Sequence, residues 1–139
     1  MIEPVWGDEL DALKIHDYIL TLDGGASGVR DTNLLKSAIA RPQQYFAYAE
    51  SPDIIEMAAK LTSGVVKNHP FVDGNKRTGF LLGALFLELN GVVLIAAEPD
   101  ATRVVLALAA GQIDEAAYAE FLRASTVPSA SSHTQTPAS

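Results

Sequence analysis

The sequence has no cysteine, no long apolar run and no excess of positive charge. Without cysteine the chain can form neither disulfides nor thiolate metal sites, which fits a reducing compartment. No window approaches the roughly 20 consecutive apolar residues that span a bilayer. The N-terminus also lacks the basic start and the apolar stretch of a signal peptide. We therefore expect a cytoplasmic protein that does not act at a membrane.

The balance of charge argues against nucleic acid as a direct partner. Ten Lys and Arg residues stand against 17 Asp and Glu residues, which gives a formal net charge of −7. Proteins that bind nucleic acids normally carry a basic face, because contacts to phosphates supply most of their affinity. Here the cations are scattered, apart from the adjacent pair Lys76 and Arg77. That pair leaves open a site for one phosphorylated small molecule.

What the sequence does contain is helical periodicity along most of its 139 residues. Apolar spacing and capping signals predict helices that begin near residues 8, 32, 53, 75, 99 and 114. For the first helix we expect Asp8 as the N-cap and a buried face made of Ala12, Ile15, Tyr18, Ile19 and Leu22. The second helix should end near Pro42 and leave residues 43–51 irregular. Residues 91–97 should form a short strand or extended chain.

The helix predicted after residue 75 is apolar on nearly every side. We expect it to be the central, buried helix of a compact, all-α, single-domain helical bundle that spans residues 1–125. Gly79 and Gly83 on this helix should let a neighbouring helix pack closely. From residue 126 to 139 the sequence is small, polar and proline-containing, which is typical of a disordered tail.

A charged segment, HPFVDGNKR, interrupts the apolar sequence from His69 to Arg77. Asn75 is a natural N-cap for the helix that follows, which places Lys76 and Arg77 in its first turn. Cations at a helix N-terminus oppose the helix dipole and cost about 0.3–1 kcal/mol. A bound anion would offset this cost, and helix N-termini are ready phosphate sites. The segment therefore predicts a phosphate-binding site.

Two further residues of this segment have the chemistry of a phosphoryl-transfer site. Asp73 is a candidate ligand for the Mg²⁺ that accompanies nucleotide phosphates. The segment contains one histidine, His69. The unperturbed pKa of a histidine side chain is roughly 6.5, which suits a general base near neutral pH. Phe71 should anchor the loop in the core, and Gly74 permits backbone conformations that other residues avoid. The segment would thus bring together a binding site for phosphate, a ligand for Mg²⁺ and a general base.

Other polar residues have simpler explanations. We expect His16, in the middle of the first helix, to serve packing. Arg30 could reach a nucleotide or a target, or form a salt bridge with the neighbouring Asp31. The glycines of DGGASG, residues 23–28, supply a turn, because they have neither the spacing nor the preceding strand of a phosphate-binding loop.

The segment His69–Arg77 resembles the signature HPFx[DE]GN[GK]R of the Fic/Doc superfamily, and it is most similar to the Doc toxin branch. The stretches IHD, GVRD, SAIARP and FLELNG also look Doc-like in order and spacing, so the resemblance extends from Met1 to about Ala124. Adenylylating Fic proteins carry glycine at the position of Lys76 and a second arginine at the position of Phe80. Doc-type proteins share the lysine and lack that second arginine.

The resemblance implies a helical Fic/Doc fold and a kinase that transfers the γ-phosphate of ATP to a threonine of elongation factor Tu, which arrests translation. It implies that His69 activates the target hydroxyl and that Asp73 orients Mg²⁺ or the nucleophile. It assigns Phe71 to anchoring the loop. Phosphates would be held by Gly74, Asn75, Lys76 and Arg77.

The resemblance also implies a partner. The chain has no match to the inhibitory helix [ST]xxxE[GN] of many Fic proteins, so a toxin of this kind would be restrained by a Phd-like antitoxin, whose helix lies in an apolar groove. Two other readings stay open. The chain could be a protein adenylyltransferase that transfers AMP, or a catalytically silent domain that only binds an antitoxin.

Overall fold

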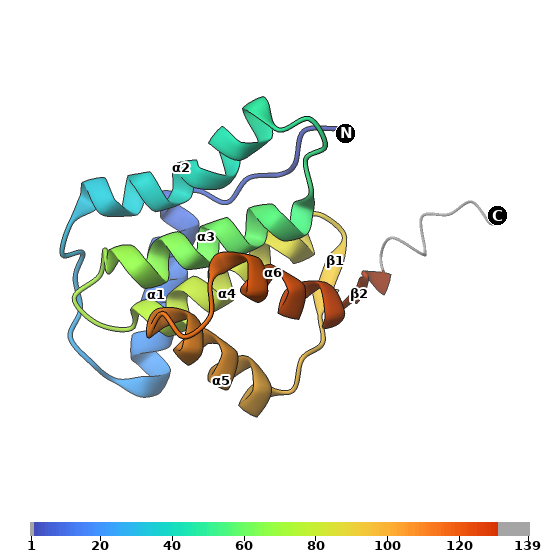
Figure 1. Cartoon of the computed structure of the whole chain (residues 1–139). Coiled ribbons are helices and arrows are strands. Elements are labelled where there is room, and N and C mark those ends of the chain that lie inside the picture. Colours follow the sequence, from blue (N-terminus) through green and yellow to red (C-terminus); the bar gives the residue numbers. More distant parts are fainter. Residues whose placement is uncertain (1, 131–139) are drawn as a thin grey trace.

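Helices form most of the protein, which is described here by a computed structural model for residues 2–130. Two short strands complete the fold (Figure 1). The elements in chain order are α1 (Glu9–Asp23), α2 (Thr32–Tyr48), α3 (Ile54–Asn68), α4 (Asn75–Leu89), β1 (Val92–Leu94), α5 (Glu98–Ala109), α6 (Glu115–Ala124) and β2 (Thr126–Pro128). The predicted all-α class is confirmed.

Helix α1 begins as the sequence predicts, but it buries a different face. Asp8 is the N-cap and forms a capping box with Asp11. The buried residues are Ala12, His16 and Ile19. The expectation that Tyr18 and Leu22 are buried is wrong, because they are 57% and 53% exposed. The buried residues follow i, i+4 and i+7, which turns the histidine toward the interior.

Helix α2 continues through Pro42 to Tyr48, so the predicted end at Pro42 is wrong. The expectation of an irregular segment is wrong for residues 43–48 and correct for residues 49–51. A proline inside a helix lacks the N–H donor and bends the helix, and α2 bends along its length (Figure 1). The residues after the proline stay helical because Tyr45 and Phe46 pack against the core. The Tyr45 hydroxyl also accepts a hydrogen bond from the N–H of Asp53 at 3.2 Å.

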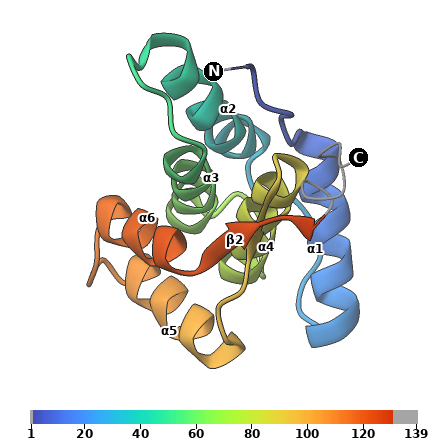
Figure 2. The ribbon, with the colours of Figure 1, turned by 90° about the vertical axis from the view of Figure 1, so that its right-hand side faces the viewer.

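Helices α3 and α4 occupy the interior, with α1 on one side and the α5–α6 pair on the other (Figure 2). Helix α3 is the more completely enclosed of the two, since all residues from Met57 to Val66 except Lys60 are buried. Helix α4 is buried on the side that contains Leu82 and Phe86. Leu87 is also buried, Leu89 is exposed, and Phe80, Leu81, Ala84 and Leu85 are partly buried, so the helix after the charged segment shares the centre with α3.

Two glycines allow α4 to approach α3 closely, as the sequence predicts. A Cβ atom on Gly79 would lie 3.0 Å from Cγ2 of Val66. A Cβ atom on Gly83 would overlap the hydroxyl oxygen of Thr62. That hydroxyl donates a hydrogen bond to the carbonyl of Gly79 at 2.7 Å. Any larger side chain at either glycine would separate the two helices that flank the charged segment.

The two strands pair antiparallel, with Val93 opposite Val127. The extended segment expected at residues 91–97 therefore contains β1. The boundary expected after residue 125 falls just before β2, and residues 131–139 of the predicted tail lie outside the described residues. Within residues 2–130, no helix combines the length and the apolar content needed to cross a membrane.

Candidate active site

His69 lies at the end of α3 in a conformation that most residues avoid. It is the C-cap of the helix, with φ 52° and ψ 56° in the left-handed region, which is unusual for a residue other than glycine. Its side chain is exposed and faces a cleft of about 520 Å³. The other polar residues of the cleft are Lys76, Arg103 and Gln112. His69, at the end of α3, and Lys76, in the first turn of α4, therefore meet at one cavity.

Arg30 contacts the charged segment itself rather than Asp31. Its guanidinium donates from Nε to the carbonyl of His69 at 2.8 Å and from Nη2 to the carbonyl of Asn68 at 2.9 Å. Its backbone N–H donates to the carbonyl of Pro70 at 2.7 Å. The segment before α2 thus runs beside the loop that follows α3 and holds the carbonyls at the end of that helix.

Hydrogen bonds between Phe71 and Asn75 hold the middle of the loop in place. Phe71 is 1% exposed. The Asn75 side chain accepts a hydrogen bond from the N–H of Phe71 at 2.9 Å and donates one to its carbonyl at 2.9 Å. Asn75 is therefore not the N-cap that the sequence predicts. Gly74 takes that position with φ 78°, which a glycine adopts without strain, and leaves the Asn75 amide free to clamp the loop.

The Asp73 carboxylate lies on the exposed side of the loop. Its Oδ1 accepts a hydrogen bond from the N–H of Gly74 at 2.9 Å, and its Oδ2 lies 3.4 Å from the N–H of Ala26. Among the described residues, no group of three or more His, Cys, Asp or Glu side chains could hold a metal ion together. A single carboxylate still suits Mg²⁺, which proteins commonly bind with one or two carboxylates and substrate phosphates.

The two cations in the first turn of α4 differ in their surroundings. Nη1 of Arg77 forms a salt bridge with Asp23, at 2.8 Å from its Oδ2. Lys76 is exposed and has no hydrogen bond or salt bridge within the part of the chain described. No side chain caps α4, so the backbone N–H groups of its first turn also remain available. This end of α4 can therefore bind an anion.

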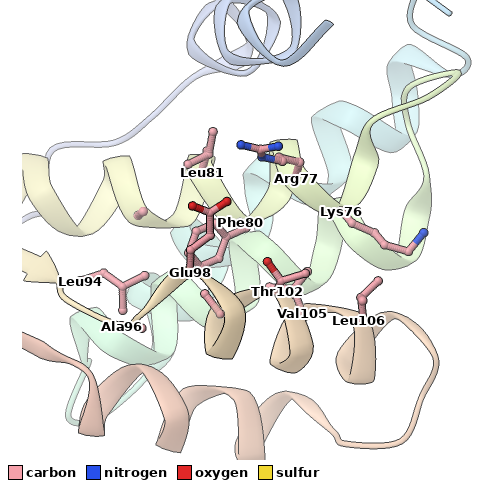
Figure 3. Close-up of a pocket in the computed structure, with 12 residues that line it drawn as sticks. Lys76, Arg77, Phe80, Leu81, Leu94, Ala96, Glu98, Thr102, Val105 and Leu106 are labelled. Atoms are coloured by element: carbon pink, nitrogen blue, oxygen red, sulfur yellow. The ribbon is translucent and has the colours of Figure 1, made fainter. Parts of the chain in front are cut away.

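A groove of about 500 Å³ runs from these cations between α4 and α5. Lys76 and Arg77 lie toward one end, and Leu94 and Ala96 lie at the other (Figure 3). Phe80 and Glu98 lie between them (Figure 3). Lys76 and Leu106 line both this groove and the cleft of His69, so the two cavities are adjacent.

Sequence reasoning missed several of these contributions. The wall formed by α5 consists mainly of small and apolar residues, which give no chemical signal. Asp23 was expected only in a turn, yet it pairs with Arg77. His16 was expected to pack, and it does, but it also lies 2.7 Å from the carbonyl oxygen of Asp73.

A comparison with protein families matches the part of the chain that contains the charged segment. Residues 6–87 match the Fic/DOC family. The chain is 31% identical over 113 residues to the protein kinase doc of Escherichia phage P1, and this match covers 81% of the chain and 89% of that protein. It is 43% identical over 74 residues to the toxin Doc of Mycolicibacterium smegmatis, which covers 52% of the chain and 57% of that toxin. Helix α5 lies beyond the family match.

Proposed function

Because this chain belongs to the Doc branch of the Fic/DOC family, we propose that it is a Doc-type toxin that acts as a protein kinase. The observation that carries the proposal is the uncapped first turn of α4, which presents the unpaired Lys76 at the same cleft as His69. A helix N-terminus with a free cation suits the phosphates of a nucleotide. A histidine at the same cleft suits removal of a proton from an attacking hydroxyl.

In the proposed reaction ATP is the phosphate donor. The hydroxyl oxygen of a target protein attacks the γ-phosphorus, the bond to the β,γ-bridging oxygen breaks, and ADP leaves. His69 accepts the proton of the hydroxyl. Lys76, Arg77 and the backbone N–H groups in the first turn of α4, from Asn75 onward, stabilise the phosphate charge. Asp73 would hold Mg²⁺, which neutralises phosphate charge when bound.

The side chains at two positions favour γ-phosphate transfer over transfer of AMP. Lys76 fills space that a glycine would leave open for phosphates. Phe80 lines the groove, and it stands at the sequence position where adenylylating relatives carry a second arginine. The proposed target is a threonine of elongation factor Tu, so the proposed effect is arrest of translation in the cytoplasm. A Phd-like antitoxin would restrain the toxin by placing a helix in an apolar groove.

Labelled ATP provides the test. The purified chain is incubated with bacterial lysate, or with purified elongation factor Tu, and with ATP labelled at either the γ or the α phosphate. We expect label on a protein of the size of the factor from γ-labelled ATP alone, and none with the His69→Ala variant. Transfer from the α phosphate would instead show an adenylyltransferase. Mass spectrometry of the labelled protein would identify the modified residue.

A catalytically silent domain is the alternative from a different class. It predicts that expression of the chain alone leaves bacterial growth unchanged. It also predicts that wild type and His69→Ala behave alike. Growth arrest that requires His69 and is relieved by a co-expressed antitoxin would exclude this alternative and support the proposed function.

A further inference from the structure

The buried histidine of α1 reaches the loop that contains Asp73. His16 is 3% exposed. Its ring stacks on the Phe71 ring with 4.0 Å between centroids and 11° between planes. Its Nε2 lies 2.7 Å from the carbonyl oxygen of Asp73. A carbonyl oxygen can only accept a hydrogen bond, so Nε2 must be the protonated nitrogen.

That carbonyl belongs to the peptide unit on which the proposed metal ligand depends. The carbonyl of Asp73 and the N–H of Gly74 are parts of one planar unit and point in opposite directions. The N–H donates to the Asp73 carboxylate at 2.9 Å. His16 holds the carbonyl of this peptide unit, so it also fixes the direction of the Gly74 N–H. The N–H in turn fixes the Asp73 carboxylate and the start of α4.

We propose that His16 is a positioning residue that fixes the Asp73–Gly74 peptide unit and so orients the Asp73 carboxylate. A purely apolar side chain would fill the same space, but it would leave the Asp73 carbonyl without this partner. The ring also lies against the backbone at Gly74, where an added Cβ atom would be 3.6 Å from its Cδ2. The effect on catalysis rests on the proposed kinase function, whereas the effect on the loop does not.

Two substitutions separate the hydrogen bond from the packing. His16→Phe keeps a ring that can stack on Phe71 but removes the donor. His16→Gln removes the ring but places an amide nitrogen at nearly the position of Nε2. Lys14→Gln, on the exposed side of α1, is the control for a change in the helix surface.

The first measurement is amide hydrogen exchange at residues 71–77, which needs no activity. We expect His16→Phe to speed exchange at the N–H of Gly74 about tenfold, because its peptide unit loses a fixed partner. His16→Gln should stay within about threefold of wild type, since the donor is restored. Unchanged exchange in His16→Phe, or equal acceleration in both variants, would mean that the ring only packs, and would overturn the proposal.

The second measurement is the Mg²⁺ concentration that gives half-maximal transfer of γ-phosphate. It should rise about tenfold in His16→Phe and recover in His16→Gln, because an incorrectly oriented carboxylate is a weaker ligand. If wild type transfers no phosphate, the proposed function fails while the exchange data still decide the role of His16. If His16→Phe does not fold, nitrogen NMR of wild type decides. A protected Nε2–H supports the proposal, and a ring protonated only at Nδ1 overturns it.

Discussion

Arg30 donates a hydrogen bond from Nε to the carbonyl oxygen of His69 at 2.8 Å, and this bond joins the segment before α2 to the residue that ends α3. Beside it, Val29 and Phe71 form an antiparallel β-bridge. His69 also donates its own N–H to the carbonyl of Val65 at 3.1 Å. The unusual backbone conformation of His69 is therefore held on both sides, which fixes where its imidazole can lie.

The first prediction tests this arrangement with Arg30→Lys. Lysine keeps the charge but cannot donate to the carbonyls of Asn68 and His69 with the fixed geometry of a guanidinium. We expect γ-phosphate transfer to fall about tenfold, while the melting temperature changes by only a few degrees, because each of the two exposed hydrogen bonds contributes at most roughly 1 kcal/mol. Initial rates and calorimetry measure the two effects. Lys36→Arg, an exposed change on α2, is the control, and a wild-type rate in Arg30→Lys would contradict the prediction.

The second prediction concerns the clamp between Asn75 and Phe71. Asn75→Ala leaves the buried N–H and carbonyl of Phe71 without their side-chain partners. We expect the free energy of unfolding to fall by at least about 2 kcal/mol, because two buried groups lose their partners and each costs about 1–3 kcal/mol. Urea denaturation measures this change. Asn33→Ala on α2, whose side chain is exposed, should cost far less, and an equal loss in both variants would rule out the clamp.

Much of the fold could be predicted because its signals are local. The N-caps Asp8, Asp53 and Asp114 lie directly before the helices that they start, and each accepts a hydrogen bond from that helix. The end of α2 could not be predicted, since Pro42 is a local stop signal that the packing of Tyr45 overrides.

The candidate site also has a part that the sequence predicts and a part that it does not. Its segment from His69 to Arg77 is continuous, so its composition alone indicated phosphate chemistry. The residues that hold the segment are distant in sequence. His16 contacts a residue 57 positions away, and Arg30 contacts one 39 positions away. No spacing rule connects such pairs, because only the packing of α1 and of the segment before α2 against the loop brings them together.

The third prediction uses two adjacent glycines with different surroundings. Gly24 and Gly25 both have positive φ, 73° and 108°, so alanine strains the backbone at either position. A Cβ atom on Gly25 would lie 2.8 Å from Oδ2 of Asp73, whereas one on Gly24 meets nothing within 4 Å. Gly25→Ala should therefore displace the Asp73 carboxylate and raise the Mg²⁺ concentration needed for transfer, while Gly24→Ala should not. Equal Mg²⁺ dependence in the two variants would show that backbone strain alone acts.

The fourth prediction concerns the salt bridge between Asp23 and Arg77. Asp23 pairs with the guanidinium that the proposed function assigns to phosphate. Asp23→Asn removes this competing charge and should lower the KM for ATP by up to about fivefold, since an exposed pair contributes roughly 0.2–1 kcal/mol. The difference should shrink at high salt, which screens the pair. Asp17→Asn, six residues away on α1, should leave KM unchanged. A higher KM in Asp23→Asn would instead show that Asp23 orients Arg77 for ATP.

The fifth prediction concerns stability in acid. Burial favours the protonated form of Glu115, but hydrogen bonds from Lys60 at 2.9 Å and Arg41 at 2.8 Å, together with their charges, lower its pKa below the ordinary 4.5. The contribution of this carboxylate to stability is therefore complete above pH 4.5 and is lost as the pH falls through the lower folded-state pKa. Glu115→Gln should lower the free energy of unfolding at pH 7 and have a smaller effect at pH 3, because the advantage of the charged carboxylate declines once the pH falls below its ordinary pKa of 4.5. Urea denaturation at the two pH values measures this, with exposed Glu120→Gln as the control. An equal loss at both pH values would show that Glu115 stabilises α6 through its shape and not through its charge.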